Sequence, residues 1–359
     1  MKIIFDDQVF IEQKWGGISS LFVNYYKQIN QYKNNKISLP FFFSFSKVLT
    51  HKIYVKKNKF FYHIVKFLNL VTVNFYLLFF DYDILHLTYF RKNLIHKKNK
   101  KFVISIPDMI PESNKHLFKD YRMVHPYKED LAKKADLIIT ISKVSKKKIL
   151  ENYKLDKDKV VIIYPSIDKV KKAKNRHLSF KDYILFVGNR DGYKNFKIVF
   201  NVFYKFSKKF QNLNLICIGQ DFSIEEKKII NRKKLNEQII NVGFVNDEYK
   251  NYLYQNAKLF VFPSLDEGFG IPIIESYANK CPVLLADTKI FREVAGEFGV
   301  FYKKNSTKDL YRKLFQILKN NNKIRNRFKS KKFIKFFKRY SHFNSKNDLE
   351  IAYSKLIND

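Results

Sequence analysis

The sequence predicts an α/β protein made of two Rossmann-like domains that face each other. Its 359 residues are too many for one ordinary hydrophobic core and suit two domains. Short apolar runs rich in β-branched and aromatic residues alternate with amphipathic helical stretches, a pattern typical of parallel sheets wound in βαβ units. A polar, basic stretch at residues 165–177 separates two such series and is interpreted as a linker.

Each series supplies the strands of one sheet. In the first series, strands are expected at residues 2–5, 84–87, 102–106, 137–140 and 160–164. In the second series, they are expected at residues 183–187, 213–218, 259–262 and 283–286. We therefore place a first domain at residues 1–167 and a second at residues 178–340. Asn344 and Ser345 precede an apolar stripe, so residues 341–359 are predicted to form a last, capped helix.

The chain is strongly basic, with a formal net charge of +36. By itself that charge favours a nucleic acid or an anionic membrane surface as a partner. However, Lys, Asn, Ile, Phe and Tyr are abundant together while Arg is scarce, which equally fits an AT-rich genome. Basic runs such as residues 97–101 are therefore interpreted as solvated faces.

The sequence predicts a cytoplasmic location. Asp6 and Asp7 come too early for a signal peptide. The longest apolar stretch, residues 67–80, falls short of the roughly 20 residues that span a bilayer, so no transmembrane helix is predicted. Cys217 and Cys281 lie in apolar runs and are expected in the cores, which fits a reducing compartment.

The most informative segment is residues 263–275, where two glutamates bracket a glycine-rich helix start with seven residues between them. Gly268 and Gly270 let the backbone approach a ligand, and the amides of a helix start favour an anion. Glu267 and Glu275 can each accept two hydrogen bonds, which suits the vicinal hydroxyls of a sugar or a ribose. The alternative is an ordinary loop entering a helix, with Glu275 solvated in its first turn.

Two other loops can meet a diphosphate. Arg190 and Lys194 lie in a glycine-bearing loop after the strand expected at 183–187, where fixed cations can stabilise a leaving diphosphate without a metal. Gly16 and Gly17 precede a helical stretch, and paired glycines there can lay amides against a phosphate. Taken singly, each segment is also compatible with a plain surface loop.

Together these segments resemble the retaining glycosyltransferases of family four, whose paired-glutamate signature has the spacing of Glu267 and Glu275. The resemblance extends to residues 108–112 and 188–195, and its wording is closest to mannosyl and related transferases of bacterial surface polysaccharide synthesis. It implies the two-domain GT-B fold, in which the last helix crosses back onto the first domain.

The resemblance also implies a role for each site residue. The donor diphosphate would be received by Gly16, Gly17, Arg190, Lys194, Gly268, Phe269, Gly270 and Ile271. Glu267 would hold hydroxyls of the transferred sugar, Glu275 the ribose, and the loop at Val245 the base. Asp108 would touch the acceptor or order its own turn. Pro107 stands where the family commonly has a histidine beside the transferred sugar, so that role is unfilled.

The implied activity is retaining, metal-independent transfer of a hexose from a nucleoside diphosphate sugar to a glycan or lipid-linked acceptor in surface polysaccharide synthesis. GDP-mannose is favoured over a UDP-sugar as donor, no cofactor is implied, and the leaving phosphate takes the acceptor proton. Lysines with Phe and Tyr in the first domain suit peripheral contact with anionic lipid on the inner face of the membrane. Asp81 and Asp83 have the spacing of a metal site in another glycosyltransferase fold, but are interpreted as a turn entering a strand.

Two alternatives stay open. A non-catalytic sugar-nucleotide-binding homologue would account for Pro107, and a basic nucleic-acid-binding protein would account for the net charge, although no nucleic acid is expected as a partner. The sequence contains no Gly-x-Gly-x-x-Gly and no Walker loop, so a nicotinamide or flavin oxidoreductase lacks its usual anchor.

Overall fold

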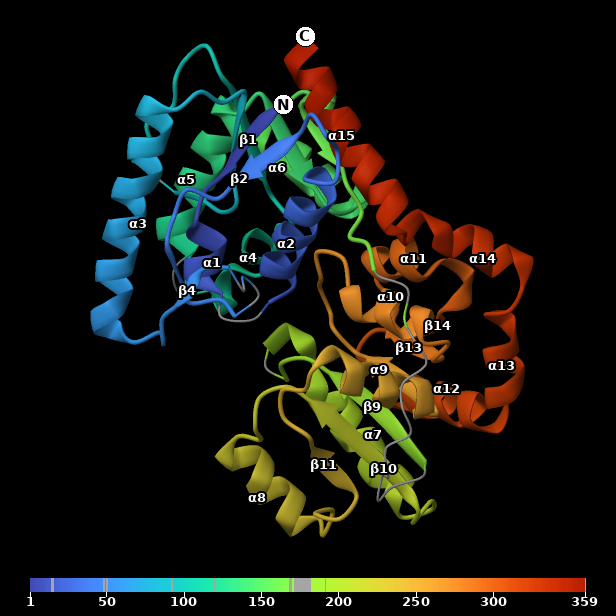
Figure 1. Cartoon of the computed structure of the whole chain (residues 1–359). Helices are drawn as coiled ribbons and strands as arrows, with labels where there is room; N and C mark the ends of the chain where they lie inside the picture. Colours follow the sequence, from blue (N-terminus) through green and yellow to red (C-terminus); the bar gives the residue numbers. More distant parts are fainter. Residues whose placement is uncertain are drawn as a thin grey trace. The chain divides into compact units, whose positions relative to one another are not determined.

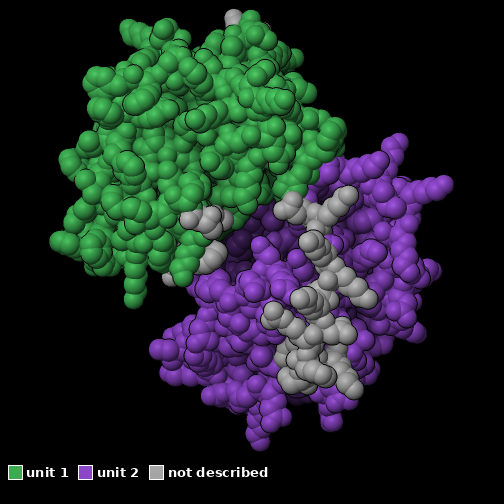
Figure 2. Space-filling model, viewed as in Figure 1, with its two compact units in different colours: residues 1–166, 342–359 green, residues 167–341 purple. Residues whose placement is uncertain are grey.

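The computed structural model of the chain contains two compact units (Figure 2). It describes residues 1–13, 16–47, 49, 51–91, 93–118, 121–167, 170, 182–190 and 192–358. Unit 1 comprises residues 1–166 and 342–359, and unit 2 comprises residues 167–341. Most of the expected linker lies outside the described residues.

Unit 1 is built on a six-stranded parallel sheet (Figure 1). Its strands, in the order β2-β1-β5-β6-β7-β8, are β2 Lys36–Ser38, β1 Lys2–Phe5, β5 Ile84–Leu87, β6 Lys101–Ser105, β7 Leu137–Thr140 and β8 Val160–Ile162. Its helices are α1 Gln8–Glu12, α2 Gly17–Ile29, α3 Lys59–Phe79, α4 Ile110–Ser113, α5 Tyr121–Lys134, α6 Lys143–Tyr153 and α15 His342–Asn358. A small separate sheet pairs β3 Phe43–Ser44 with β4 Ile53–Tyr54.

Unit 2 repeats this architecture with a second six-stranded parallel sheet. Its strands, in the order β11-β10-β9-β12-β13-β14, are β11 Ile239–Asn241, β10 Leu213–Ile218, β9 Asp182–Val187, β12 Leu259–Phe262, β13 Val283–Ala286 and β14 Val300–Tyr302. Its helices are α7 Phe196–Ser207, α8 Ile224–Arg232, α9 Asp247–Asn256, α10 Ile271–Ala278, α11 Lys289–Ala295, α12 Thr307–Lys319, α13 Asn321–Arg327 and α14 Lys331–Phe337.

All nine expected strands occur, because a parallel strand buried on both faces produces a continuous apolar run in the sequence. The strands β2, β11 and β14 were not predicted, since each has only three residues and none is buried throughout. Both cysteines lie in the core of unit 2 as predicted, and burial raises the pKa of each thiol to about 12.

In each sheet the strand order reverses beside the first strand. β1 pairs with both β2 and β5, and β9 pairs with both β10 and β12. In sheets of this kind, ligands bind beyond the carboxyl ends of the strands at the reversal point. In unit 2 the two loops at that point follow β9 and β12, and they carry the predicted cations and the first predicted glutamate.

The last helix, α15, belongs to unit 1, as predicted. Tyr353 of α15 is fully buried, and its hydroxyl lies 2.6 Å from Nδ1 of His86 in β5. The other ring nitrogen of His86 lies 2.8 Å from Ser105 Oγ in β6. Burial lowers the pKa of His86 to about 3, so this histidine is a neutral core residue that fastens the helix to the sheet.

Helix α3 is longer than the sequence indicated. Asn58 caps it by accepting a hydrogen bond from the backbone of Phe61, so the helix begins at Lys59 and has 21 residues. By length and composition alone it could cross a membrane, which differs from the sequence prediction. Only 22% of the most apolar 18-residue stretch of this helix is buried.

Candidate functional site

The loops after β9 and β12 are joined by an ion pair between two predicted site residues. Lys194 Nζ lies 2.6 Å from Glu267 Oε1, with the two side chains 20% and 11% exposed. A backbone hydrogen bond of 2.8 Å, from Leu265 to the carbonyl of Tyr193, holds the same loops together. A cation and a carboxylate therefore meet at the carboxyl edge of the sheet, at its reversal point.

The glycine-rich segment ends in the helix start that the sequence predicted. Gly270 is the N-cap of α10, and its φ of 97° lies in the region that favours glycine. A Cβ there would also lie 3.1 to 3.3 Å from side-chain atoms of Ile273, Phe262 and Phe291. Phe269 is buried against the Tyr340 ring, with 5.6 Å between the ring centroids. This packing fixes the orientation of the first turn of α10, which begins at Ile271.

The second glutamate, Glu275, lies one turn inside α10 and has two partners on α9. Lys250 Nζ lies 2.7 Å from Oε1, and the Tyr254 hydroxyl donates to Oε2 at 3.2 Å. Burial alone would lower the pKa of Lys250, but the charge of Glu275, helped by Asp247, raises it above its ordinary value. Val245 lies half-buried in the loop that leads from β11 into α9, so the same helix connects the predicted base loop with Glu275.

Arg190 and Lys194 pair with different carboxylates, Glu226 and Glu267 respectively. The Arg190 side chain is buried, with Nε donating to Glu226 Oε1 at 2.9 Å and Nη2 donating to the Asp221 carbonyl at 2.6 Å. Its guanidinium lies over the Phe222 ring, 4.7 Å from the centroid. Nη1 is buried without a hydrogen-bond partner among the described residues. Glu226 of α8 thus orients the Arg190 guanidinium, and its Nη1 group makes no hydrogen bond to the described residues.

In unit 1, the two predicted glycines open α2. Gly16 is the N-cap in an extended conformation, and Gly17 is the first helical residue. A Cβ on Gly16 would lie 2.3 Å from Gln13 Oε1, so a larger residue there would displace the Gln13 side chain. The same oxygen accepts a hydrogen bond from the Ser19 amide at 3.3 Å, which fixes the entrance of the helix.

Asp108 orders its own turn, which is one of the two roles expected for it. Its Oδ1 accepts a hydrogen bond from the Ile110 amide at 3.0 Å. Its carbonyl accepts from Lys128 Nζ at 2.8 Å, and the same ammonium lies 3.0 Å from Glu112. Pro107 is buried in front of this turn. The segment that resembles the family thus has an ordered loop but no ionisable group at position 107.

Asp81 and Asp83, which have the spacing of a metal site, lie just before β5, at the edge of the unit 1 sheet where its strands begin. Asp81 contacts the ammonium groups of Lys2 and Lys100 at 3.2 and 2.8 Å, and Asp83 accepts from the Lys2 backbone amide at 2.7 Å. Both carboxylates therefore fasten the start of β1 and β5, as expected of a turn that enters a strand.

Three contacts of the candidate site were not predicted, namely Glu226 with Arg190 and both Lys250 and Tyr254 with Glu275. The pattern Ser223-x-x-Glu226 is readable as a capping box and does form one, but it indicates only a helix start. Nothing in the sequence pairs Lys250 with Glu275, because the contact depends on how α9 packs against α10.

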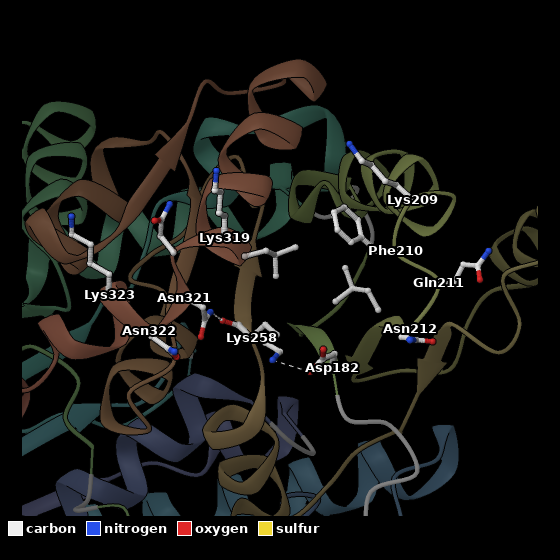
Figure 3. Close-up of a pocket in the computed structure, with 13 residues that line it drawn as sticks. Asp182, Lys209, Phe210, Gln211, Asn212, Lys258, Lys319, Asn321, Asn322 and Lys323 are labelled. Atoms are coloured by element: carbon white, nitrogen blue, oxygen red, sulfur yellow. Dashed lines mark hydrogen bonds and ion pairs between the residues drawn. The ribbon is translucent and has the colours of Figure 1, made fainter.

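A hollow of about 700 Å³ lies at the opposite edge of the unit 2 sheet, where β9, β10 and β12 begin (Figure 3). Lys258 and Asp182 form an ion pair of 2.8 Å on its wall. The predicted donor loops follow the carboxyl ends of the strands instead, so this hollow is not the candidate site.

Two family models match the chain. The model for glycosyl transferases group 1 matches residues 167–333, and the model for glycosyltransferase family 4 matches residues 43–171. The chain is therefore similar to these glycosyltransferase families in two successive segments, as the sequence motifs predicted. The group 1 match contains the predicted donor loops described above, from Arg190 to Glu275.

Curated proteins that are similar to the chain include two transferases. It is 30% identical over 165 residues to the O-antigen chain mannosyltransferase RfbU of Salmonella typhimurium, covering 45% of each chain. It is 30% identical over 205 residues to the N-acetylgalactosamine-N,N'-diacetylbacillosaminyl-diphospho-undecaprenol 4-alpha-N-acetylgalactosaminyltransferase of Campylobacter jejuni, covering 55% of this chain and 54% of that one. The matches thus span about half the length of these relatives.

Among solved structures, HepE of Anabaena in complex with UDP-glucose matches with a TM-score of 0.72 and 16% sequence identity. The match covers 99% of this chain and 100% of that one. It confirms the predicted GT-B fold, an α/β architecture of two Rossmann-like domains.

Proposed function

We propose that the chain is a retaining, metal-independent glycosyltransferase that moves a sugar from a nucleoside diphosphate to an acceptor. The observation that carries the proposal is the Lys194–Glu267 pair at the reversal point of the unit 2 sheet, beside the start of α10. A cation suited to phosphate and a carboxylate suited to sugar hydroxyls stand in contact at the place where sheets of this type bind nucleotides.

In this proposal the donor exchanges partners with that pair. The diphosphate takes Lys194, and Glu267 is released to accept hydrogen bonds from hydroxyls of the sugar. The loop from Gly268 to Gly270 leads into the first turn of α10, which begins at Ile271 and adds the positive end of a helix to the field around the phosphates. As the sugar leaves, negative charge grows on the bridging oxygen. A single fixed donor aimed at such charge contributes roughly 3 to 4 kcal/mol of transition-state stabilisation.

The other predicted residues complete the donor site in this proposal. Arg190 offers its remaining Nη1 to the diphosphate, while Glu226 fixes the plane of the guanidinium. Glu275 receives the ribose, and Val245 lies at the base. Gly16, Gly17 and Asp108, which the resemblance also assigns to the site, lie in unit 1, at the start of α2 and just before α4.

For the donor we favour GDP-mannose over a UDP-sugar, and for the acceptor a glycan or lipid-linked oligosaccharide of a surface polysaccharide. The relative RfbU is by name an O-antigen chain mannosyltransferase, and the Campylobacter relative acts by name on a diphospho-undecaprenol glycan. HepE, solved with UDP-glucose, supports a nucleotide sugar without supporting guanine. A cytoplasmic enzyme in peripheral contact with the inner, anionic face of the membrane would meet such acceptors.

The proposal is tested by nucleotide release. The purified chain is incubated with a panel of GDP- and UDP-sugars, and the freed nucleotide is identified and timed. Glu267→Ala should lower turnover by roughly 100- to 1,000-fold, as loss of one oriented group at the reacting centre does. Glu297→Ala is the matched control, because Glu297 also pairs with a lysine, at 2.7 Å, but away from the donor loops. Equal turnover in both variants would contradict the assignment.

A non-catalytic sugar-nucleotide binder is the second candidate, favoured by the buried Pro107. Its outcome differs from that of an enzyme in the same experiment: the chain would bind a nucleotide sugar without releasing nucleotide, and Glu267→Ala would change affinity alone. A nucleic-acid-binding protein would instead bind oligonucleotides with a steep salt dependence.

A further inference from the structure

Helix α3 lies on the outside of unit 1 (Figure 1), and the side of it that faces away from the unit is apolar. Large hydrophobic side chains on this face are between 40% and 70% exposed. They are Phe60, Ile64, Phe67, Leu68, Val71, Phe75, Leu78 and Phe79. We call these eight residues the α3 face.

The opposite side of α3 packs on unit 1 through a narrow stripe. Val65, Asn69, Val73 and Leu77 are buried, and their spacing of four residues places them in one row. An ordinary surface helix would carry polar residues on the other side. Here the α3 face lacks charged residues, and contiguous exposed apolar patches of this kind mark interaction sites.

Positive charge gathers at both ends of the α3 face. Lys56 and Lys59 precede or begin the helix, and Lys97 lies at its other end, with Nζ 3.4 Å from the Phe80 carbonyl. The only acidic residues between positions 53 and 101 are Asp81 and Asp83. Lysine ammonium groups on long stems, next to exposed aromatic rings, suit a surface that is apolar inside and anionic outside.

We propose that α3 docks lengthwise on a lipid bilayer that contains anionic lipids, with the α3 face buried among the acyl chains. The lysines at its ends would then contact lipid phosphates. Interfacial helices bind in this way, through apolar area on one side and attraction to anionic headgroups. The inference rests on the membrane contact proposed above and names the surface that makes it.

The contacts of α3 favour lying on the bilayer over spanning it. Asn69, in the middle of the helix, donates to Asp7 Oδ2 at 3.0 Å and to the Phe43 carbonyl at 2.9 Å. Near the start of the helix, the Tyr62 hydroxyl donates to Glu12 Oε1 at 2.6 Å. A spanning helix would lose all of these buried polar contacts, whereas a docked helix keeps them.

A second copy of the chain is a poorer occupant of the α3 face. Both ends of the helix are basic, so two copies would bring lysines together whether their helices met parallel or antiparallel. Like charges at close range oppose such contact. An anionic bilayer is complementary to both ends at once.

The test is co-sedimentation of the purified, folded chain with preformed vesicles of phosphatidylcholine, with and without phosphatidylglycerol. The wild type should bind the anionic vesicles, and less so at high salt. Phe67→Glu with Phe75→Glu should lower the partition coefficient at least about tenfold. The matched control is Phe343→Glu with Ile351→Glu, which adds the same charge at two exposed positions of α15 in the same unit. The control should stay within about twofold of the wild type.

Three outcomes would overturn the proposal: no binding by the wild type, equal binding by the α3 variant, or a wild-type dimer that the α3 variant dissociates while vesicle binding is unchanged. Sedimentation without vesicles reports the last. If the double glutamate variant misfolds by circular dichroism, Phe67→Ser with Phe75→Ser replaces it. Nucleotide release with a soluble acceptor should be unchanged in the α3 variants, so failure of the docking surface and failure of the transferase proposal are distinguishable.

Discussion

The two sheets place charged groups at equivalent positions, after their first strands, but bury them to different degrees. After β1, Asp7 pairs with Arg91, and both side chains are almost completely buried, at 0% and 4% exposure. After β9, Lys194 pairs with Glu267, and both keep some access to solvent. The same topology thus holds a closed ion pair in unit 1 and an open one in unit 2.

The difference teaches which charges can serve a ligand. A buried pair cannot exchange its partner without exposing a bare charge in the interior, so it acts on stability. A partly exposed pair can exchange a carboxylate for a phosphate at little cost, so it is suited to binding. The degree of burial, more than the type of residue, separates the structural pair from the candidate functional pair.

The largest effect is expected from Arg91→Met. It leaves Asp7 charged and buried, and loss of one partner of such a pair costs about 3 to 5 kcal/mol of unfolding free energy. Urea unfolding would measure it. Arg292→Met is the matched control, because Arg292 and Asp287 form a pair that is 56% and 44% exposed. A loss no greater than that of the control would show that the unit 1 pair is not closed.

A pH dependence of intermediate size is expected from Asp6. Burial, with the neighbouring charge of Asp7, raises the pKa of Asp6 to about 6, against the opposing effects of Arg91 and Thr88. An acid whose pKa is higher in the folded state holds its proton more tightly there. Its contribution to stability is therefore full at low pH and is lost as the pH rises through roughly 4 to 6.

Asp6→Asn removes this titration and supplies the reference. The unfolding free energy of the wild type, relative to that of the variant, should fall by about 2 to 3 kcal/mol between pH 4 and pH 7. Urea unfolding at a series of pH values measures the difference. Parallel curves for the two proteins would mean that Asp6 titrates alike in the folded and unfolded chain.

The smallest effect on stability is expected from Lys194→Met. The two side chains keep 20% and 11% exposure, so the loss of unfolding free energy should stay below the roughly 3 to 5 kcal/mol expected when a fully buried pair is broken. Nucleoside diphosphate binding, measured by calorimetry, should weaken by roughly tenfold, because the proposed phosphate cation is lost. The contrary result would be a loss of unfolding free energy as large as in Arg91→Met, with unchanged nucleoside diphosphate binding. The Lys194–Glu267 pair would then be a structural pair like Asp7–Arg91.

Much of the fold could be predicted because burial leaves a direct trace in the sequence. Strands such as β10 Leu213–Ile218 are covered on both faces and appear as unbroken apolar runs. The edge strands β2, β11 and β14 have no such apolar run. Each is only partly buried and forms as a strand because it pairs with a neighbouring strand. The start of α3 was missed for a related reason. The longest apolar stretch of the sequence begins at Phe67, but the helix begins at Lys59, because Asn58 caps it.

The candidate site was predicted in its backbone and not in its side-chain partners. Glycine, proline and glutamate spacing indicates where a loop enters a helix, and Gly270 lies there with the positive φ that requires glycine. That Glu226 holds Arg190 and that Lys250 holds Glu275 follows from the packing of α8 and α9, which brings together residues 36 and 25 positions apart. Sequence spacing carries no information on such contacts.

The two ends of unit 2 are paired with each other. Ile167 forms a β-bridge with Ser341, and its amide donates to the Tyr340 carbonyl at 3.1 Å. Unit 2 is therefore an insertion in the chain of unit 1, and the chain enters and leaves it at adjacent points. Domains with adjacent termini often tolerate insertion into another protein. Because the chain passes between the units only at these two adjacent points, residues 166 and 342 are the natural boundaries for exchanging unit 2 as one piece.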